Sequence, residues 1–242
     1  MASRIHFISD LHLNEGRPEN TQRFLTYLDA LDSTVSDLYI LGDLFDVWVG
    51  DDDTTPPNSD VKERLKAAAD KGLRVFFIAG NRDFLIGKAF FKETQVTCLA
   101  DESVIDLFGV KTLLMHGDLL CTDDIEYQQF RALTHNADWQ QAALSKPLDE
   151  RLMLAQQYRQ QSHLNKKNKA RDIMDVNVST VVETMAKHAV QRLIHGHTHR
   201  PDLHQHCVNN LPVERFVLAE WDDKGGSVLE WNSTGYKIIP LA

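Results

Sequence analysis

Short apolar runs recur along the chain, and most of them lead into a polar turn that contains glycine. They occupy residues 5–8, 38–41, 75–78, 110–115 and 192–194. Apolar runs this short, bounded by turn residues, are typical of buried strands. Residues 20–31 and 59–71 have a helical pattern, and Gly72 is the expected C-cap of the second helix. Alternating strands and helices predict an α/β fold in a single domain of residues 1–242.

Two later segments depart from this alternation. The distances between successive strand-end residues (10 to 43, 43 to 81, 81 to 116) are similar, but the next one, 116 to 197, is more than twice as long. Residues 127–168 contain no glycine and are rich in Gln, Leu, Ala and Lys, which predicts a helical insertion at 122–175, acting as a lid over the strand ends. From Glu214 onward, short strands and polar turns predict a second, more antiparallel sheet layer.

Polar side chains follow the predicted strands at five places along the chain. Active sites of α/β folds usually lie at the carboxyl ends of their strands. The side chains found there are Asp10, His12, Asp43, Asn81, His116, His197 and His199. Carboxylate, imidazole and amide oxygen together suit Mn²⁺, Fe²⁺ or Zn²⁺. Seven groups are too many for one ion with room for substrate, so we expect two ions that share a carboxylate.

Each of these motifs has a simpler structural interpretation. An Asp-x-His or Gly-Asp pair is common, and a single His after a strand is more often a satisfied hydrogen-bonding residue than a ligand. Alternate residues of an extended segment point the same way, so His195, His197 and His199 could share a face. The ordered occurrence of five such segments, each at a strand end, favours the metal-site interpretation.

Composition and charge narrow the classes of protein that fit. The chain is 43% hydrophobic and 25% charged, which excludes collagen-like, disordered and disulfide-scaffold proteins. Its net charge of −9 argues against generic nucleic-acid binding. Against that background, one span of the insertion carries five basic residues and no acid: Arg159, Lys166, Lys167, Lys169 and Arg171. This span is either a solvated helix face or a seat for a glycosyl diphosphate or anionic lipid headgroups.

The chain shows neither a signal-peptide pattern nor an apolar stretch long enough to span a bilayer. The three cysteines, Cys98, Cys121 and Cys207, form no C-x-x-C pair, and we expect each to be a small buried hydrophobic residue. Together these features predict a reducing, cytoplasmic setting.

The ordered motifs resemble those of the calcineurin-like metallophosphoesterase family. The resemblance covers residues 4–220 and rests on the following segments: Asp10-x-His12, Gly42-Asp43, Gly80-Asn81-Arg82-Asp83, His116 and Gly196-His197-Thr198-His199. It implies an αββα sandwich of two sheets with two metals at the strand ends. One metal would be held by Asp10, His12, Asp43 and His199, and the other by Asp43, Asn81, His116 and His197. Water activated by the metals would be the nucleophile, and the implied catalytic residues are Asp43, Asn81, Arg82, His116 and His197.

One position departs from the pattern of the wider family. Gly-Asn-His is usual there, but this chain has Arg82, which can grip phosphate oxygens and cannot donate a proton at neutral pH. This favours a diphosphate substrate with a good leaving group. The neighbouring Asp83 either orients Arg82 or is an ordinary surface residue.

Further segments, at residues 38–45, 80–85, 120–124 and 173–177, are similar to one subfamily. These are the pyrophosphatases of bacterial lipid A synthesis, which cleave UDP-2,3-diacylglucosamine to UMP and 2,3-diacylglucosamine 1-phosphate. The resemblance implies Mn²⁺ as the metal, attack on the α-phosphorus and no obligate protein partner. The implied substrate contacts are Asn81, Arg82, Asp124, Ser162, Lys166, Lys169 and His197. Because the substrate carries two acyl chains, the protein would bind peripherally to the inner face of the bacterial inner membrane.

The apolar side chains of the insertion either pack on the core or line an acyl pocket. They are Phe130, Leu133, Trp139, Leu144, Leu148, Leu152 and Met153.

Two other functions remain open. The chain could be a phosphoesterase for another nucleotide diphosphate or a phosphoprotein, which Arg82 and the basic span disfavour, or a noncatalytic scaffold, which the complete ligand set disfavours.

Overall fold

The computed structural model describes residues 3–168 and 175–242, with only the backbone of residues 161–168. The five apolar runs form strands, as predicted: β1 (Arg4–Ile8), β2 (Val35–Leu41), β3 (Arg74–Ile78), β6 (Val110–Leu114) and β7 (Arg192–His195). Strands β1, β2 and β3 are parallel neighbours, and the short β4 (Thr97–Cys98) continues this sheet at its edge. The first sheet therefore directs the carboxyl ends of three strands to one side of the molecule.

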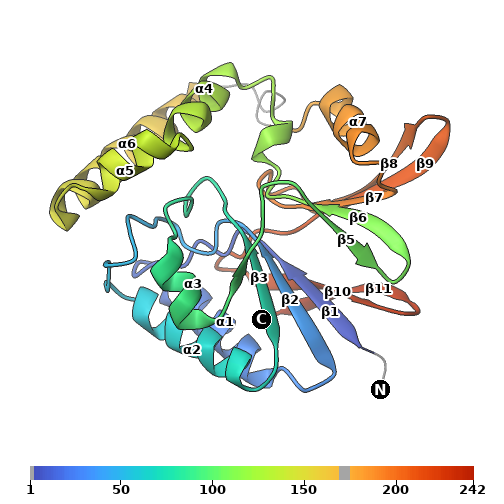
Figure 1. Cartoon of the computed structure of the whole chain (residues 1–242), viewed down its shortest axis with the longest axis horizontal. Coiled ribbons are helices and arrows are strands. Elements are labelled where there is room, and N and C mark those ends of the chain that lie inside the picture. Colours follow the sequence, from blue (N-terminus) through green and yellow to red (C-terminus); the bar gives the residue numbers. More distant parts are fainter. Residues whose placement is uncertain (1–2, 169–174) are drawn as a thin grey trace.

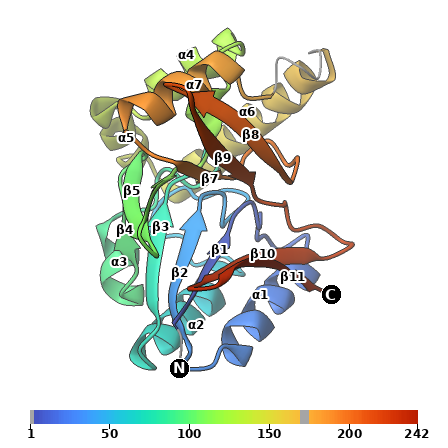
Figure 2. The same ribbon diagram turned by 90° about the vertical axis from the view of Figure 1, so that its right-hand side faces the viewer.

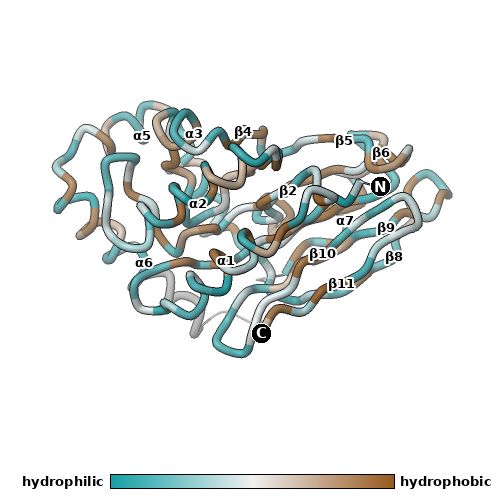
Figure 3. The backbone as a smooth tube through the Cα atoms, turned by 90° about the horizontal axis from the view of Figure 1, so that it is seen from below, coloured by the Kyte–Doolittle hydropathy of each residue, from teal (hydrophilic) through white to brown (hydrophobic). Residues whose placement is uncertain are grey.

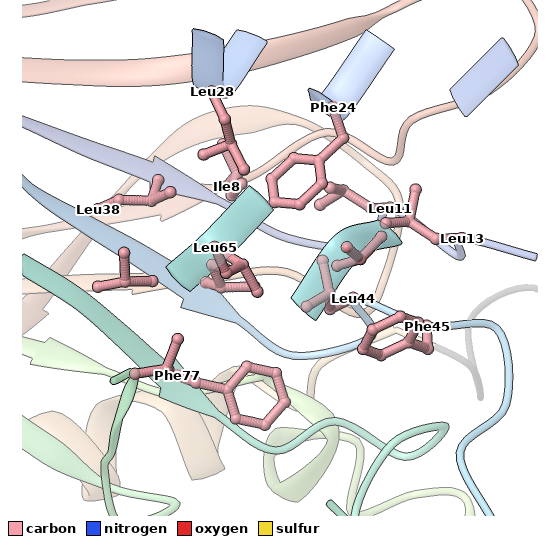
Figure 4. Close-up of a cluster of buried hydrophobic side chains, with 14 of the residues drawn as sticks. Ile8, Leu11, Leu13, Phe24, Leu28, Leu38, Leu44, Phe45, Leu65 and Phe77 are labelled. Carbon is pink, nitrogen blue, oxygen red and sulfur yellow. The ribbon is translucent and has the colours of Figure 1, made fainter. Parts of the chain in front are cut away.

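Three helices cover one face of the first sheet: α1 (Pro18–Ala30), α2 (Asn58–Asp70) and α3 (Lys88–Thr94). A proline opens α1, where its missing N–H leaves no donor unsatisfied. Phe24 and Leu28 are one helical turn apart and pack with Leu65 of α2 on the sheet (Figure 4). Helix α2 ends at Asp70 with Lys71 as its C-cap, and the predicted cap Gly72 follows one position later in the left-handed conformation, with a φ of +99°.

The alternation of side chains along each strand separates two layers of core. In β2, Leu38 and Ile40 face the helices, whereas Tyr39 and Leu41 face a second sheet. That sheet has the order β5-β6-β7-β9-β8, with β5 at Ser103–Leu107, β8 at Asp202–Val208 and β9 at Leu211–Val217. Its outer face packs on α7 (Val178–Lys187), so the layers are helices, sheet, sheet and helix (Figure 2). The αββα sandwich is confirmed.

The C-terminal hairpin does not belong to the second sheet, so that prediction was wrong for the last two strands. Strand β10 (Gly226–Asn232) pairs antiparallel with β1, and β11 (Gly235–Leu241) pairs with β10. Both faces of β10 are buried, because Val228 packs toward the helices whereas Leu229 packs between the sheets. A strand that is apolar on both faces fits beside the buried β1 better than at an outer layer.

The long segment between β6 and β7 begins with the 3₁₀ turn η1 (Asp118–Leu120) and continues as α4 (Ile125–Thr134), α5 (Ala137–Leu144) and α6 (Leu148–Asn168). We call α4–α6 the helical insertion. It lies beyond the carboxyl ends of β1, β2 and β3 and extends sideways from the sandwich (Figure 1). Asp124 and Asn136 cap α4 and α5 with side-chain oxygens, which explains where these helices begin.

A buried arginine attaches the insertion to the core. The Arg151 guanidinium donates to the Val49 carbonyl, pairs with Asp52 at 2.8 Å and also donates from Nε to the Lys146 carbonyl. Phe84, which follows β3, contacts the ring of Trp139 in α5. The insertion is thus joined to the loops that follow both β2 and β3.

No helix within the described residues is long and apolar enough to cross a membrane. Hydrophobic and hydrophilic stretches alternate along the chain, as Figure 3 shows. The prediction for the cysteines was correct only for Cys121. Cys98 and Cys207 are exposed, because they lie on the strands at the edges of the two sheets.

Candidate metal centre and adjoining cavity

Five loops at the carboxyl ends of β1, β2, β3, β6 and β7 bring the seven predicted ligands together. Asp10, Asp43 and His116 are buried, and the others are buried or half-buried. Five of the seven adopt the left-handed backbone conformation, with φ between 50° and 67°: Asp10, His12, Asp43, His197 and His199. Residues other than glycine are strained in the left-handed conformation, and such strain is concentrated at functional sites.

Two glycines make the close approach of these loops possible. A Cβ on Gly80 would lie 2.1 Å from Oδ1 of Asp43, and one on Gly196 would lie 2.2 Å from Oδ2 of Asp10. Any side chain at either position would push a carboxylate out of the centre.

Asp83 has neither of the roles considered for it from the sequence. It is buried, and its carboxylate accepts the backbone N–H groups of Gly80 at 2.8 Å and Leu44 at 2.7 Å. Longer hydrogen bonds come from the N–H groups of Asp43 and Phe45. It therefore holds the loop after β2 against the loop after β3, so that Asp43 and Asn81 both lie beside Nε2 of His116.

Asp10, His12 and His199 form the first half of the centre. Nε2 of His199 lies 3.2 Å from Oδ1 of Asp10 and 3.4 Å from Nε2 of His12. The other ring nitrogen of His199 pairs with Glu220 at 2.7 Å, which directs Nε2 inward. Oδ2 of Asp10 accepts the His197 N–H at 2.9 Å, so this aspartate also positions the backbone that carries both histidines.

Asn81, His116 and His197 form the second half. Oδ1 of Asn81 lies 3.1 Å from Nε2 of His116 and 3.0 Å from Nδ1 of His197, and the two ring nitrogens are 3.1 Å apart. Nδ1 of His116 donates to the Leu41 carbonyl, which leaves Nε2 to face the centre. Asp43 lies between the halves, 3.8 Å from Nε2 of His116 and 3.9 Å from Nδ1 of His12.

The electrostatics of the centre favour a bound cation. Burial raises the pKa of Asp43 to about 7, with the nearby Asp83 and Asp10 carboxylates adding to the rise. Burial also lowers the pKa of His116, but Asp43, Asp10 and Asp118 outweigh it and raise that pKa to about 9. The buried Nδ1 of His12 has no hydrogen-bond partner among the described residues. A divalent cation would offset the negative charge of the buried carboxylates and give Nδ1 of His12 a partner.

His195 does not share a face with His197 and His199. It is buried, its Nδ1 lies 2.9 Å from the Gly196 carbonyl, and its Nε2 lies 3.1 Å from Nη1 of Arg215. The alternation expected of an extended segment fails because φ is positive at both His197 and His199.

The predicted substrate contacts fall into two groups. Asn81, Arg82, Asp124 and His197 line one cavity, of about 410 Å³, next to the centre. The side chains of Ser162, Lys166 and Lys167 and the whole of Lys169 and Arg171 lie outside the described residues. The basic span can therefore be placed only at its first member, Arg159, which pairs with Asp46 and also lines the cavity.

Beyond the centre, the cavity wall is mostly apolar. The lining side chains from the core are Val47, Trp48, Val49, Phe84 and Leu85, and those from the insertion include Phe130, Trp139, Ala143, Leu154, Ala155 and Tyr158. Phe130 and Trp139 thus line the cavity, one of the two roles considered for the apolar set. Leu133, Leu144 and Met153 are exposed instead. In α6 the inward face repeats at 151, 154, 155 and 158, so Leu148 and Leu152 lie outside the lining.

Glu220, Asp118 and Tyr127 also belong to the site, although sequence reasoning did not select them. Glu220 orients His199, and the ring of Tyr127 lies 5.7 Å from that of His197, between centroids. Asp118 comes directly after His116-Gly117, and this position beside a ligand was the one signal in the sequence that could have pointed to it.

A sandwich with carboxylate, imidazole and amide ligands on five strand-end loops is the architecture of metal-dependent phosphoesterases. The family model for calcineurin-like phosphoesterases matches residues 3–201, and the chain belongs to this family. Curated relatives named UDP-2,3-diacylglucosamine hydrolase are similar over nearly their whole length. The protein from Enterobacter sp. strain 638 is 47% identical over 96% of this chain and 97% of its own. The protein from Aromatoleum aromaticum is 46% identical over 95% of this chain and 93% of its own length. The protein from Salmonella paratyphi B is 48% identical over 92% of this chain and 92% of its own length.

Proposed function

We propose that the chain hydrolyses the diphosphate of UDP-2,3-diacylglucosamine, giving UMP and 2,3-diacylglucosamine 1-phosphate, a step of lipid A synthesis. The observation that carries this proposal is the position of the apolar cavity, which opens directly beside the ligand cluster. Relatives with the corresponding name match at 46–48% identity and extend through the insertion that forms one wall of this cavity. A substrate with a diphosphate at one end and acyl chains at the other fits this pairing of charged and apolar surfaces.

We propose two divalent metal ions, with Mn²⁺ as the native metal. Asp10, His12 and His199 would hold one, Asn81, His116 and His197 the other, and Asp43 would bridge them. Such ions, when bound, activate water at neutral pH and offset the charge on phosphate oxygens. The mixture of carboxylate, amide and imidazole donors suits Mn²⁺ better than thiol-preferring metals.

The remaining roles fall to residues around the ions. The Arg82 guanidinium lines the cavity near Asp43, where it can hold the diphosphate oxygens in a bidentate fork. The Arg82 backbone N–H donates to Asp43 at 2.9 Å, so the phosphate grip and the proposed bridging ligand are parts of one loop. Asn81 and His197 would contact both metal and substrate. Ser162, Lys166, Lys169 and Asp124 are proposed as further contacts to the substrate.

We also propose that the protein works at the surface of the inner membrane, on its cytoplasmic face. Ile125 and Val178, at the starts of α4 and α7, are 61% and 59% exposed. The two helix starts are joined, because Asn177 donates to the Asp123 carboxylate and Thr122 hydrogen bonds to Thr180. Asp124 and Glu126, on either side of Ile125, line the cavity, so this apolar pair lies near the cavity mouth, where acyl chains would enter from a bilayer.

The reaction itself can be tested by UMP release from the acylated UDP-sugar. With Mn²⁺ we expect release of UMP, and with excess chelator we expect none, because no ion would be left to activate water or to offset the charge on the phosphate oxygens. Asp43→Ala should reduce kcat/KM at least about 100-fold, since loss of even an outer partner of a metal ligand costs about 10–100-fold. His204→Ala on β8 is the control. Chelator-insensitive release, or equal rates with other nucleotide diphosphates, would contradict the proposal.

The acyl-binding role of the cavity predicts a difference between substrates. Removing the ring of Trp139, in Trp139→Ala, should lower kcat/KM for the diacyl substrate about 10–100-fold, equivalent to roughly 1.5–3 kcal/mol of lost apolar contact. The same variant should change hydrolysis of a deacylated analogue much less. Leu144→Ala, on the exposed side of the same helix, serves as the matched control. Equal losses on both substrates would contradict an acyl pocket.

Co-sedimentation with anionic liposomes at low salt tests the membrane proposal. The wild-type chain should pellet with the vesicles, and Ile125→Ser combined with Val178→Ser should reduce the pelleted fraction several-fold, because inserted apolar side chains contribute to binding. Ile238→Ser on β11 is a control of equal exposure, at 63%, on a strand outside the cavity lining. If the wild-type chain stays in the supernatant, the membrane proposal is wrong.

A further inference from the structure

Asp118 is a buried carboxylate that lies next to the metal centre but outside the proposed ligand set. It begins η1, two residues after His116, and is 3% exposed. One of its oxygens, Oδ2, accepts hydrogen bonds from the Tyr127 hydroxyl at 2.7 Å and from Nε of Arg131 at 2.6 Å. The Asp118 main-chain carbonyl accepts a third, from Gln128 at 2.8 Å. All three donors lie on α4, so one residue of the core anchors the first helix of the insertion.

The anchoring places an aromatic ring against a proposed metal ligand. With its hydroxyl bound to Asp118, Tyr127 presents its ring to the His197 imidazole, at 5.7 Å between centroids and an interplanar angle of 35°. His197 is half-buried, and its Nδ1 lies 3.0 Å from Oδ1 of Asn81 and 3.1 Å from Nε2 of His116. The imidazole orientation therefore depends on α4 as well as on its own loop.

A second contact makes the anchor rigid. Arg131 lies one helical turn after Tyr127. It forms ion pairs with both Asp118 and Asp101, each at 2.6 Å, and Asp101 lies in the turn before β5. The Arg131 side chain is 11% exposed and that of Asp118 is 4% exposed, so this ion pair is shielded from water, whereas the Asp101 side chain is 44% exposed. Together, Asp118 and Asp101 tie α4 to both ends of the β5–β6 hairpin.

We propose that Asp118 is a positioning residue that couples the helical insertion to the metal centre. It fixes α4 by way of Tyr127 and Arg131, and through the Tyr127 ring it restrains the His197 imidazole in its ligating orientation. The inference rests on the proposed metal-dependent function, because its main consequence concerns metal affinity. Displacing α4 should weaken metal binding at the half of the centre that contains His197. Loss of the Asp118 carboxylate should therefore loosen α4 and weaken metal binding at the same time.

The test uses the full chain with Mn²⁺ alone as the probe. Calorimetric titration should show that Asp118→Asn raises the Kd for Mn²⁺ about 10–100-fold, the range for partners of metal ligands. Hydrogen exchange of the α4 amides should increase in the same variant. Asp37→Asn is the matched control: Asp37 is also buried and also pairs with an arginine, Arg74, but lies at the amino end of β2. It should leave the Kd within about twofold and α4 exchange unchanged.

Tyr127→Phe tests the same coupling if Asp118→Asn does not fold. It keeps the ring and removes one hydrogen bond, so it should raise the Kd about 10-fold, the lower end of the effect of losing such a partner, and increase α4 exchange. Unchanged Mn²⁺ affinity in the variants, or an equal loss in Asp37→Asn, would overturn the inference. A wild-type chain that bound no divalent ion would instead refute the proposed function and, with it, this coupling.

Discussion

The burial of three carboxylates at one edge of the first sheet is the constraint on which the rest of the site depends. Asp83 is satisfied by backbone N–H groups of two loops. Asp10 and Asp43 face a space bounded by imidazoles, and their charge calls for a cation. Five of the proposed ligands adopt the left-handed conformation, which is the backbone strain of bringing these groups together, and Gly80 and Gly196 leave room for the two carboxylates.

The strands and the clustering of the seven proposed ligands could be predicted from the sequence because both follow from local patterns. Short apolar runs mark buried strands, and polar residues at their ends meet at one edge when the strands are parallel. The position of β10 could not be predicted, since its pairing with β1 is a contact between distant parts of the chain. The same holds for Asp83 and His195, whose partners come from the loop after β2 and from β9. Periodicity assigns a residue to an element, but it does not reveal its partner.

The insertion illustrates a second limit. Its composition indicated helices, and α4, α5 and α6 occupy that segment. Which side faces the cavity depends on how each helix is rotated against the core, and in α6 that rotation follows from the burial of Arg151 beside Val49. Once Arg151 points inward, Leu154 and Tyr158 follow on the same face, and Leu152 does not. The buried Arg151 contact, together with the Arg159–Asp46 pair on the same face, thus sets which side chains of α6 form the cavity wall.

The most direct test of the proposal that Asp43 and its six neighbours hold two divalent ions is anomalous X-ray diffraction from crystals grown with Mn²⁺. Two anomalous peaks about 3.5–4 Å apart are expected. One should lie beside Asp10, His12 and His199, and the other beside Asn81, His116 and His197. A single peak, peaks elsewhere, or an empty centre at saturating Mn²⁺ would contradict it.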